Sequence, residues 1–297
     1  MSVAIAEPRL RVRAADVWAL GKPRVSVMVF TQSLGGMWLS PMPLVLGPTL
    51  LALFGICLVV YAANALNMYL ERDVDGLMSR TRTRPLPAGT MEPEVALRIG
   101  IATSVLAVGV LTFGVNPLTG LLSAFSLVLY VLAYTPMKRR TTLALLVGAI
   151  PGAAPPLLGW TAATGRIDPG GLALFLILFL WQIPHFHAIS IFRRDDYVRA
   201  GLKVMPGVRG IAATKVRIIL YAALLGIATL PAYAAGLSSK GYLFIAVPLS
   251  FAFLLLTLVG LRPGMTLEDD RRWARRVFFF TLLHLPLVLG ALVYFRR

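Results

Sequence analysis

The stretch NALNMYLERDVDGLMSRTRTRPLPAG, residues 64–89, follows an apolar run that is long enough to cross a bilayer. It places three carboxylates and four arginines directly after that run. On a helix, Asn67, Glu71 and Asp75 share one face, because a step of four residues advances by only about 40°. Oxygen ligands in such an array suit a hard cation such as Mg²⁺, which binds a few carboxylates and the phosphates of a substrate. The pattern predicts a diphosphate site.

An alternative for this stretch is a solvated cytoplasmic loop whose charges only determine the membrane topology. The regular spacing of the oxygen ligands and a second acidic cluster at the same membrane edge favour a binding site. Carboxylates at a membrane edge are costly unless they are paired or bind a ligand. We therefore predict that Asn67, Glu71 and Asp75 are metal ligands and catalytic residues.

The composition indicates a polytopic membrane protein. Of the 297 residues, 58% are hydrophobic and only 14% are charged, which is too apolar for a soluble domain of this length. The net charge of +16 could suggest nucleic acid, but the basic residues lie between the apolar runs, so we expect no nucleic-acid partner. The single cysteine, Cys57, excludes a disulfide framework and a cysteine metal site.

Runs of about 20 apolar residues predict an all-α bundle of nine transmembrane helices. The predicted spans are 25–45, 49–70, 95–114, 118–136, 142–162, 170–191, 214–235, 241–261 and 275–295. We expect residues 1–24 to form a cytoplasmic N-terminal tail and residues 25–297 to form one transmembrane domain.

The basic residues predict the orientation of this bundle. With the N-terminus in the cytoplasm, 25 Lys and Arg residues lie on the cytoplasmic side, and four lie outside: Arg166, Lys240, Arg296 and Arg297. This distribution follows the positive-inside rule, and the odd number of spans puts the C-terminus outside. No signal peptide is recognisable, which favours a bacterial plasma membrane, with a mitochondrial inner membrane as the alternative.

Two further motifs add polar residues at the membrane edge. Tyr134 and Lys138 follow the fourth span, where Lys138 would offer its charge to a phosphate and Tyr134 would donate a hydrogen bond. Both residue types are also common at interfaces without any function. In the fifth span, glycines and prolines between Gly148 and Pro156 are expected to thin and kink the helix, which would make room for a large ligand.

The sixth span ends in WQIPHFHAISIFRRDDY, residues 181–197. Gln182 and His185 share a face, whereas His187 lies about 200° away from His185, so we expect His185 to face an acceptor such as an iron porphyrin. The alternative is a buried packing histidine. Asp195 and Asp196 follow, and they would bind a second cation or neutralise nearby arginines. The remaining residues that we expect to contact substrates are His187, Lys22, Arg24, Arg72, Arg80, Arg82, Arg84, Arg194 and Lys203.

In combination, Asn67-x-x-x-Glu71-x-x-x-Asp75 with RTRTRPLPAG, Tyr134-x-x-x-Lys138 and the aspartates of the sixth loop resemble the UbiA superfamily of intramembrane prenyltransferases. The segments LGKPRVSVM (20–28), YTPMKRRT (134–141), GAIPGAAPPLLGW (148–160) and WQIPHFHAISIFRRDDY (181–197) are similar to the haem-farnesylating branch of that superfamily. The resemblance covers nearly the whole chain.

The resemblance implies nine helices around a central cavity and two acidic motifs that bind an isoprenyl diphosphate through Mg²⁺. In this branch it implies farnesyl diphosphate as donor, the 2-vinyl group of haem b as acceptor and haem O as product, with haem A synthase or an oxidase assembly factor as a partner. Two features depart from the pattern. Glu71 stands where aspartate is common, and Arg199 and Ala200 replace the second aspartate of an Asp-x-x-x-Asp motif.

Two other functions are compatible with these residues. A UbiA-type enzyme for an aromatic or quinone-precursor acceptor would use the same diphosphate site and differ only in its acceptor pocket. A membrane haem carrier would use His185 as an axial ligand, and it would bind haem without releasing diphosphate. The mass of the product distinguishes the aromatic-acceptor enzyme from a haem-farnesylating enzyme. Diphosphate release distinguishes either enzyme from a haem carrier.

Overall fold

The computed structural model describes residues 13–297, which form a helical bundle without any strand. Three elements start the chain: α1 (Ala14–Leu20), α2 (Pro23–Leu39) and α3 (Leu46–Gly76). The middle holds α4 (Pro93–Gly114), α5 (Pro117–Val128), the π-helix η1 (Leu129–Tyr134), α6 (Thr135–Met137), α7 (Ala144–Thr164) and α8 (Pro169–Phe192). The last part holds α9 (Arg194–Arg199), α10 (Met205–Val208), α11 (Gly210–Ala228), α12 (Leu230–Ala234), η2 (Lys240–Tyr242), α13 (Leu243–Leu258), η3 (Val259–Leu261) and α14 (Leu267–Tyr294).

The predicted fold class is confirmed, because eight helical segments in the described part of the chain are long and apolar enough to cross a membrane. The remaining predicted span, 25–45, corresponds to α2, which has 17 residues and ends earlier than expected. It ends at Leu39 because Pro41 and Pro43 follow, and neither can donate a helical hydrogen bond. The Ser40 hydroxyl instead donates to the Met37 carbonyl (2.7 Å).

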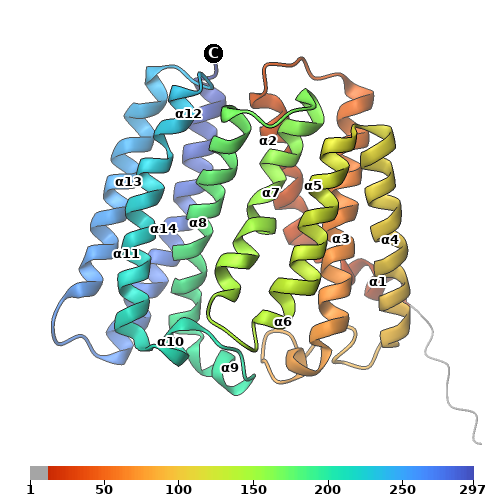
Figure 1. The fold of residues 1–297 in the computed structure, drawn as a ribbon. Coiled ribbons are helices and arrows are strands. Elements are labelled where there is room, and N and C mark those ends of the chain that lie inside the picture. Colours follow the sequence, from red (N-terminus) through yellow and green to blue (C-terminus); the bar gives the residue numbers. More distant parts are fainter. Residues whose placement is uncertain (1–12) are drawn as a thin grey trace, which may run out of the picture.

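The long helices run side by side, and the short elements gather at the two ends (Figure 1). In that view α1, α6, α9 and α10 lie at the lower end, whereas α12 and the C-terminus lie at the upper end. Helix α7 packs against α2 and α8, and α8 also packs against α11 and α14. Large apolar side chains such as Phe113 and Phe244 are exposed on the outside of the bundle, as expected where helices face lipid.

Helices α2 and α7 approach each other closely through two glycines. A Cβ atom on Gly36 would lie 2.0 Å from the carbonyl oxygen of Pro156, and one on Gly159 would lie 2.0 Å from that of Ser33. Only glycine fits at such positions, and small residues at helix crossings are typical of membrane bundles.

The glycines of α7 do not open space for a ligand, contrary to the sequence-based expectation. A Cβ on Gly148 would lie 2.5 Å from the ring of Tyr134, and one on Gly152 would lie 2.3 Å from Oε1 of Gln182. Neighbouring side chains therefore occupy the room that these glycines leave. Helix α7 also remains helical through its three prolines.

The segment before α2 packs against the bundle. Of the expected N-terminal tail, residues 1–12 lie outside the described part of the chain, and residues 14–20 form α1. The hydroxyl of Tyr61 in α3 donates to the Val17 carbonyl (2.7 Å), and the Asn64 amide donates to the Gly21 carbonyl (3.1 Å). These bonds place Lys22 close to the polar end of α3.

Candidate active site

Helix α3 carries the predicted oxygen ligands on its buried face. It has 31 residues, so about the last three turns extend beyond a 20-residue membrane span. Asn67 and Asp75 are each 1% exposed and Glu71 is 9% exposed, whereas Asp73 on the opposite side of the helix is exposed. The predicted spacing thus does place Asn67, Glu71 and Asp75 on one inward face.

Asn67 is held from three directions. Its Nδ2 donates to Oε2 of Glu71 (2.9 Å) and to Oγ1 of Thr135 at the start of α6 (3.2 Å). Its Oδ1 accepts a hydrogen bond from Nζ of Lys22 (3.1 Å). The amide therefore points Oδ1, the atom that could bind a cation, toward Lys22.

Lys138 forms an ion pair with Glu71. Its Nζ lies 2.8 Å from Oε1 and 2.9 Å from Oε2 of that carboxylate, and 4.5 Å from the centre of the Tyr134 ring. The π-helix η1 directly precedes this segment, and π-helical turns are frequently found at functional sites. Tyr134 thus contacts the Lys138 ammonium through its ring.

Asp75 is fixed by the loop that follows α3. Oδ2 of Asp75 accepts from Nη1 of Arg84 (2.6 Å), and the Thr81 hydroxyl donates to the Asp75 carbonyl (2.8 Å). The other oxygen, Oδ1, is buried and has no hydrogen-bond partner within residues 13–297. A buried carboxylate oxygen without a partner is costly, so a bound cation would satisfy it.

Lys22 enters the site from the break between α1 and α2. It is the only non-glycine residue among residues 13–297 with a positive φ (48°), a left-handed conformation that is unfavourable for a residue with a Cβ. Burial, together with the nearby positive charges of Arg84 and Lys138, lowers the pKa of Lys22 to about 7, although Glu71 and Asp75 act in the opposite direction. An anionic ligand would favour the charged form of Lys22.

The positive charges of this cluster exceed the negative ones when Lys22 is protonated. Lys138 pairs with Glu71 and Arg84 pairs with Asp75, so the surplus is the charge of Lys22, which a bound anion would favour. Asn67 Oδ1, the Glu71 carboxylate and the unpaired Oδ1 of Asp75 form a hard oxygen donor set that fits Mg²⁺. The cationic side chains beside them fit the phosphate oxygens of a substrate.

The structure joins Asp196 to the loop after α3, whereas Asp195 lies elsewhere. Oδ2 of Asp196 accepts from the Ser79 hydroxyl in that loop (3.2 Å), and the same carboxylate pairs with Arg193 (3.7 Å) and Arg199 (3.6 Å), as the alternative of neutralised arginines predicts. The backbone N–H of Lys203 donates to the Lys138 carbonyl (2.8 Å), which joins the second acidic segment to the first. Oδ2 of Asp195 instead pairs with Arg271 of α14 (2.5 Å), and its side chain is 66% exposed. The Asp195 carboxylate therefore points toward α14 and not toward the cluster.

The other predicted basic residues lie at varying distances from the cluster. Nη2 of Arg80 donates to the hydroxyl of Tyr197 (3.3 Å), which keeps Arg80 at the mouth of the site. Nη1 of Arg72 donates to the Tyr69 carbonyl (2.7 Å), on the side of α3 away from the carboxylates. The side chains of Arg24, Arg82 and Lys203 are exposed, and Nε of Arg194 is buried without a partner in the described structure.

The histidines of α8 lie between helices. Nδ1 of His185 is 2.7 Å from Oγ1 of Thr281 in α14, and its ring stacks on Trp181. Gln182 donates to the Ala149 carbonyl of α7 (2.8 Å), and His187 is buried. Pro184 does not break the helix, so the predicted angle between the histidines holds. However, Gln182 and His185 reach different neighbours, and neither contacts the carboxylate cluster through these bonds.

Three polar residues of the site were not predicted from the sequence: Thr135, Ser79 and Thr81. Thr135 lies beside the predicted Tyr134, and Ser79 and Thr81 lie within the predicted arginine segment. Their roles depend on contacts between segments that are far apart, such as the 117 residues between Ser79 and Asp196. Only the proximity of Thr135 to the Tyr-x-x-x-Lys motif could have suggested one of them.

A cavity of about 470 Å³ lies directly beside the carboxylate cluster. Its wall includes Glu71, Val74, Val131 and Thr135, so it is mostly apolar and has one carboxylate at its edge. Arg139 and Arg140 lie at the same cavity. The site therefore combines a metal-binding donor set, surplus positive charge and adjoining apolar space inside a membrane bundle.

Comparison with known proteins assigns a family to this arrangement. The model of the UbiA prenyltransferase family matches residues 28–283. The chain therefore belongs to the UbiA prenyltransferase family, and it is a multi-pass membrane enzyme. This membership favours a transferase over a haem carrier.

Similar sequences specify the branch of the family. The protohaem IX farnesyltransferase of Sorangium cellulosum is 50% identical over 281 residues, which cover 90% of this chain and 99% of that protein. The protohaem IX farnesyltransferase of Anaeromyxobacter dehalogenans is 45% identical over 296 residues, which cover 98% and 99%.

Solved structures share the fold at low identity. A structure from a study of digeranylgeranylglyceryl phosphate synthase has a TM-score of 0.81 at 16% identity, and the match covers 94% of this chain and 97% of that one. A UbiA homologue from Archaeoglobus fulgidus, solved with DMAPP and Mg²⁺ bound, has a TM-score of 0.65 at 16% identity, and covers 93% and 99%.

Proposed function

We propose that this protein is a protohaem IX farnesyltransferase. It transfers the farnesyl group from farnesyl diphosphate to the 2-vinyl group of haem b, and it releases haem O and diphosphate. The observation that carries this proposal is the buried ladder of Asn67, Glu71 and Asp75 with its surplus positive charge. The relatives at 45–50% identity over nearly the whole chain support haem as the acceptor.

We assign the binding of the diphosphate to the α3 cluster. Asn67, Glu71 and Asp75 would hold Mg²⁺, with Asp196 as a further ligand across the mouth. When bound, Mg²⁺ supplies positive charge to the leaving diphosphate. Lys22, Lys138 and Arg84 would bind the other phosphate oxygens, where they stabilise the negative charge that builds up as the allylic C–O bond breaks.

The remaining steps take place at the apolar side of the site. The terminal vinyl carbon of haem bonds to the first carbon of the farnesyl chain, and diphosphate leaves with the electron pair of the broken C–O bond. Water then adds to the positive charge left beside the porphyrin and loses one proton, which completes the hydroxyethylfarnesyl group. The apolar wall of Val74 and Val131 would keep other water away from the allylic carbon.

We also propose the cellular placement of this reaction. The distribution of Lys and Arg supports a bacterial plasma membrane protein with the N-terminus and the active-site mouth in the cytoplasm and the C-terminus on the opposite side. A haem A synthase or an oxidase assembly factor would receive the product as a partner.

The mass of the product tests this function. Purified protein is supplied with Mg²⁺, farnesyl diphosphate and either haem b or 4-hydroxybenzoate. The expected product is haem with an added farnesyl group and one added hydroxyl group, formed together with diphosphate. A prenylated 4-hydroxybenzoate with unmodified haem would support the aromatic-acceptor enzyme instead. Bound haem without diphosphate release would support the carrier.

A further inference from the structure

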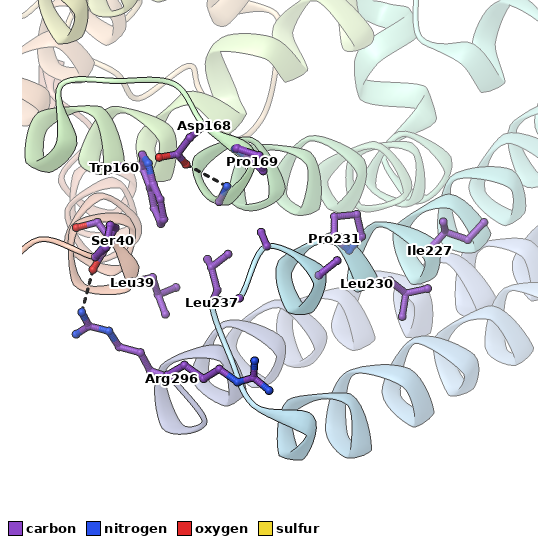
Figure 2. A pocket seen from close by; sticks show the side chains of 16 residues that line it. Leu39, Ser40, Trp160, Asp168, Pro169, Ile227, Leu230, Pro231, Leu237 and Arg296 are labelled. Atoms are coloured by element: carbon purple, nitrogen blue, oxygen red, sulfur yellow. Dashed lines mark hydrogen bonds between the residues drawn. The ribbon is translucent and has the colours of Figure 1, made fainter.

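A second cavity, of about 850 Å³, lies at the end of the bundle opposite the carboxylate cluster. The end of α2, the start of α8, α12 and the C-terminal residues surround it (Figure 2). Its wall includes the buried Leu39 and Leu237 and the exposed Ile227 and Leu230. Since Ile227 and Leu230 belong to a membrane-spanning segment, the cavity borders the lipid.

Two arginines line this cavity. Nη2 of Arg296 donates to the carbonyl of Ser40 (2.9 Å), a contact visible in Figure 2, and its guanidinium lies 5.4 Å from the Trp38 ring. The guanidinium of Arg297 lies 5.7 Å from the Tyr233 ring. A guanidinium has five N–H donors, so the contact with Ser40 leaves Arg296 able to bind another acceptor. The aromatic rings hold both cations at the cavity.

The basic residues of this side are concentrated at the cavity. Only four Lys and Arg residues of the sequence are assigned to the outer side, and Arg296 and Arg297 both line the cavity. A third, Arg166, pairs with Asp168 on the cavity wall (3.4 Å). Arg166 therefore matches the charge of Asp168, which also caps α8. The two C-terminal guanidinium groups exceed the main-chain carboxylate of Arg297 by one positive charge. Lys and Arg are usually concentrated on the cytoplasmic side of a membrane protein, so a pair of arginines on the outer side is consistent with a binding role.

The cavity wall also holds a hydrogen-bond donor without a partner. Trp160 is 4% exposed, and its indole Nε1 has no hydrogen-bond partner in the described structure. A buried donor that lacks an acceptor is costly, so native proteins rarely leave one. A ligand with several oxygen atoms in this cavity would supply the acceptor.

We propose that this cavity binds the phosphate head group of an anionic phospholipid from the leaflet opposite the active site. Arg296 and Arg297 contact the phosphate oxygens, and Leu39, Leu230 and Leu237 contact the carbon atoms next to the head group. The bound lipid connects α2 with α12 and the end of α14, two parts of the bundle that contact each other little elsewhere. It stabilises the fold and takes no part in prenyl transfer.

Thermal stability of the delipidated protein in detergent tests this site. The melting temperature is measured without lipid and with phosphatidylglycerol, phosphatidylcholine or soluble glycerol phosphate. Four proteins are compared: wild type, the double variant R296A/R297A, the variant A235W, and the double variant R275A/R276A. A235W places an indole ring in the cavity, where it would obstruct a head group, but keeps both arginines. R275A/R276A removes an exposed arginine pair from the other end of the same helix, α14, as a matched control.

Phosphatidylglycerol should raise the melting temperature of the wild type and of R275A/R276A more than phosphatidylcholine does. Most of this difference should be lost in R296A/R297A and in A235W, and native mass spectrometry should show less retained phosphatidylglycerol in both. If R296A/R297A does not fold, A235W decides the question. A difference that persists in A235W, an equal loss in R275A/R276A, an equal effect of phosphatidylcholine, or full stabilisation by glycerol phosphate alone would overturn the proposal.

Discussion

At the scale of single residues, each carboxylate or amide group of the site contacts its own cationic side chain. Lys138 pairs with Glu71, Arg84 pairs with Asp75 and Lys22 contacts Asn67, so each ligand has a positive partner from a different segment. These cations provide partners for carboxylates that would otherwise be buried without any. The same cations can then turn to the phosphate oxygens when a metal ion takes over the carboxylates.

The replacement Lys138→Met tests this shared role. It should lower kcat/KM for farnesyl diphosphate by roughly 100-fold, because a fixed charge that stabilises the leaving diphosphate is lost. The exposed Arg98 of α4, replaced as Arg98→Met, serves as the control and should change kcat/KM only slightly. Steady-state kinetics in detergent with haem b as acceptor measure both. Equal losses in the two variants would mean that Lys138 acts only through the general positive charge of this end.

The sequence predicted the shared face of Asn67, Glu71 and Asp75 better than it predicted the partners of these residues. Asn67, Glu71 and Asp75 could be recognised because a spacing of four residues is local and survives in any helix. Thr135 contacts Asn67 across 68 residues of sequence, a relationship that no local pattern contains. Likewise, helical geometry predicted the angle between His185 and His187, but not that Thr281 of α14 would be the neighbour of His185.

At the scale of helices, the hydrogen bonds between the α1 segment and α3 place Lys22, and the crossing of α2 and α7 is a separate contact. The apolar runs predicted where the spans lie, since the length of a membrane segment follows from the bilayer, but α3 and α14 continue well beyond the predicted spans at their polar ends. The purpose of the glycines in α7 could not be predicted, because a glycine that admits a ligand and one that admits a neighbouring helix look the same in the sequence. The structure shows that Gly36 and Gly159 bring the two backbones into contact.

The replacement Gly36→Ala should therefore destabilise the protein. A Cβ at 2.0 Å from the Pro156 carbonyl oxygen forces the two helices apart, and overpacking of this kind costs about 1–3 kcal/mol. Gly35→Ala is the matched control, since a Cβ on Gly35 meets nothing within 4 Å. Thermal unfolding in detergent compares them. A Gly36→Ala protein as stable as Gly35→Ala would contradict the close packing of α2 and α7.

At the scale of the whole molecule, the two ends of the bundle are chemically different. One end carries the carboxylate cluster with most of the basic residues, and the other carries the lipid-bordering cavity with two C-terminal arginines. Alkaline phosphatase fused after Arg140 should be inactive, because the proposed orientation puts that end in the cytoplasm. The same enzyme fused after Gly165 or after Arg297 should be active. Activity after Arg140 would reverse the predicted orientation.

The central claim is that the inward oxygen ladder of α3 binds the metal ion and the diphosphate of the donor. The most direct measurement is Mg²⁺-dependent diphosphate release by Asp75→Asn and by Asp73→Asn, each checked for wild-type thermal stability. These variants remove the same charge from the same helix, but Asp75 is buried in the cluster and Asp73 is exposed. Asp75→Asn should lose activity by about 100-fold or more, and Asp73→Asn should keep it. Wild-type release by Asp75→Asn at saturating Mg²⁺ would contradict the claim.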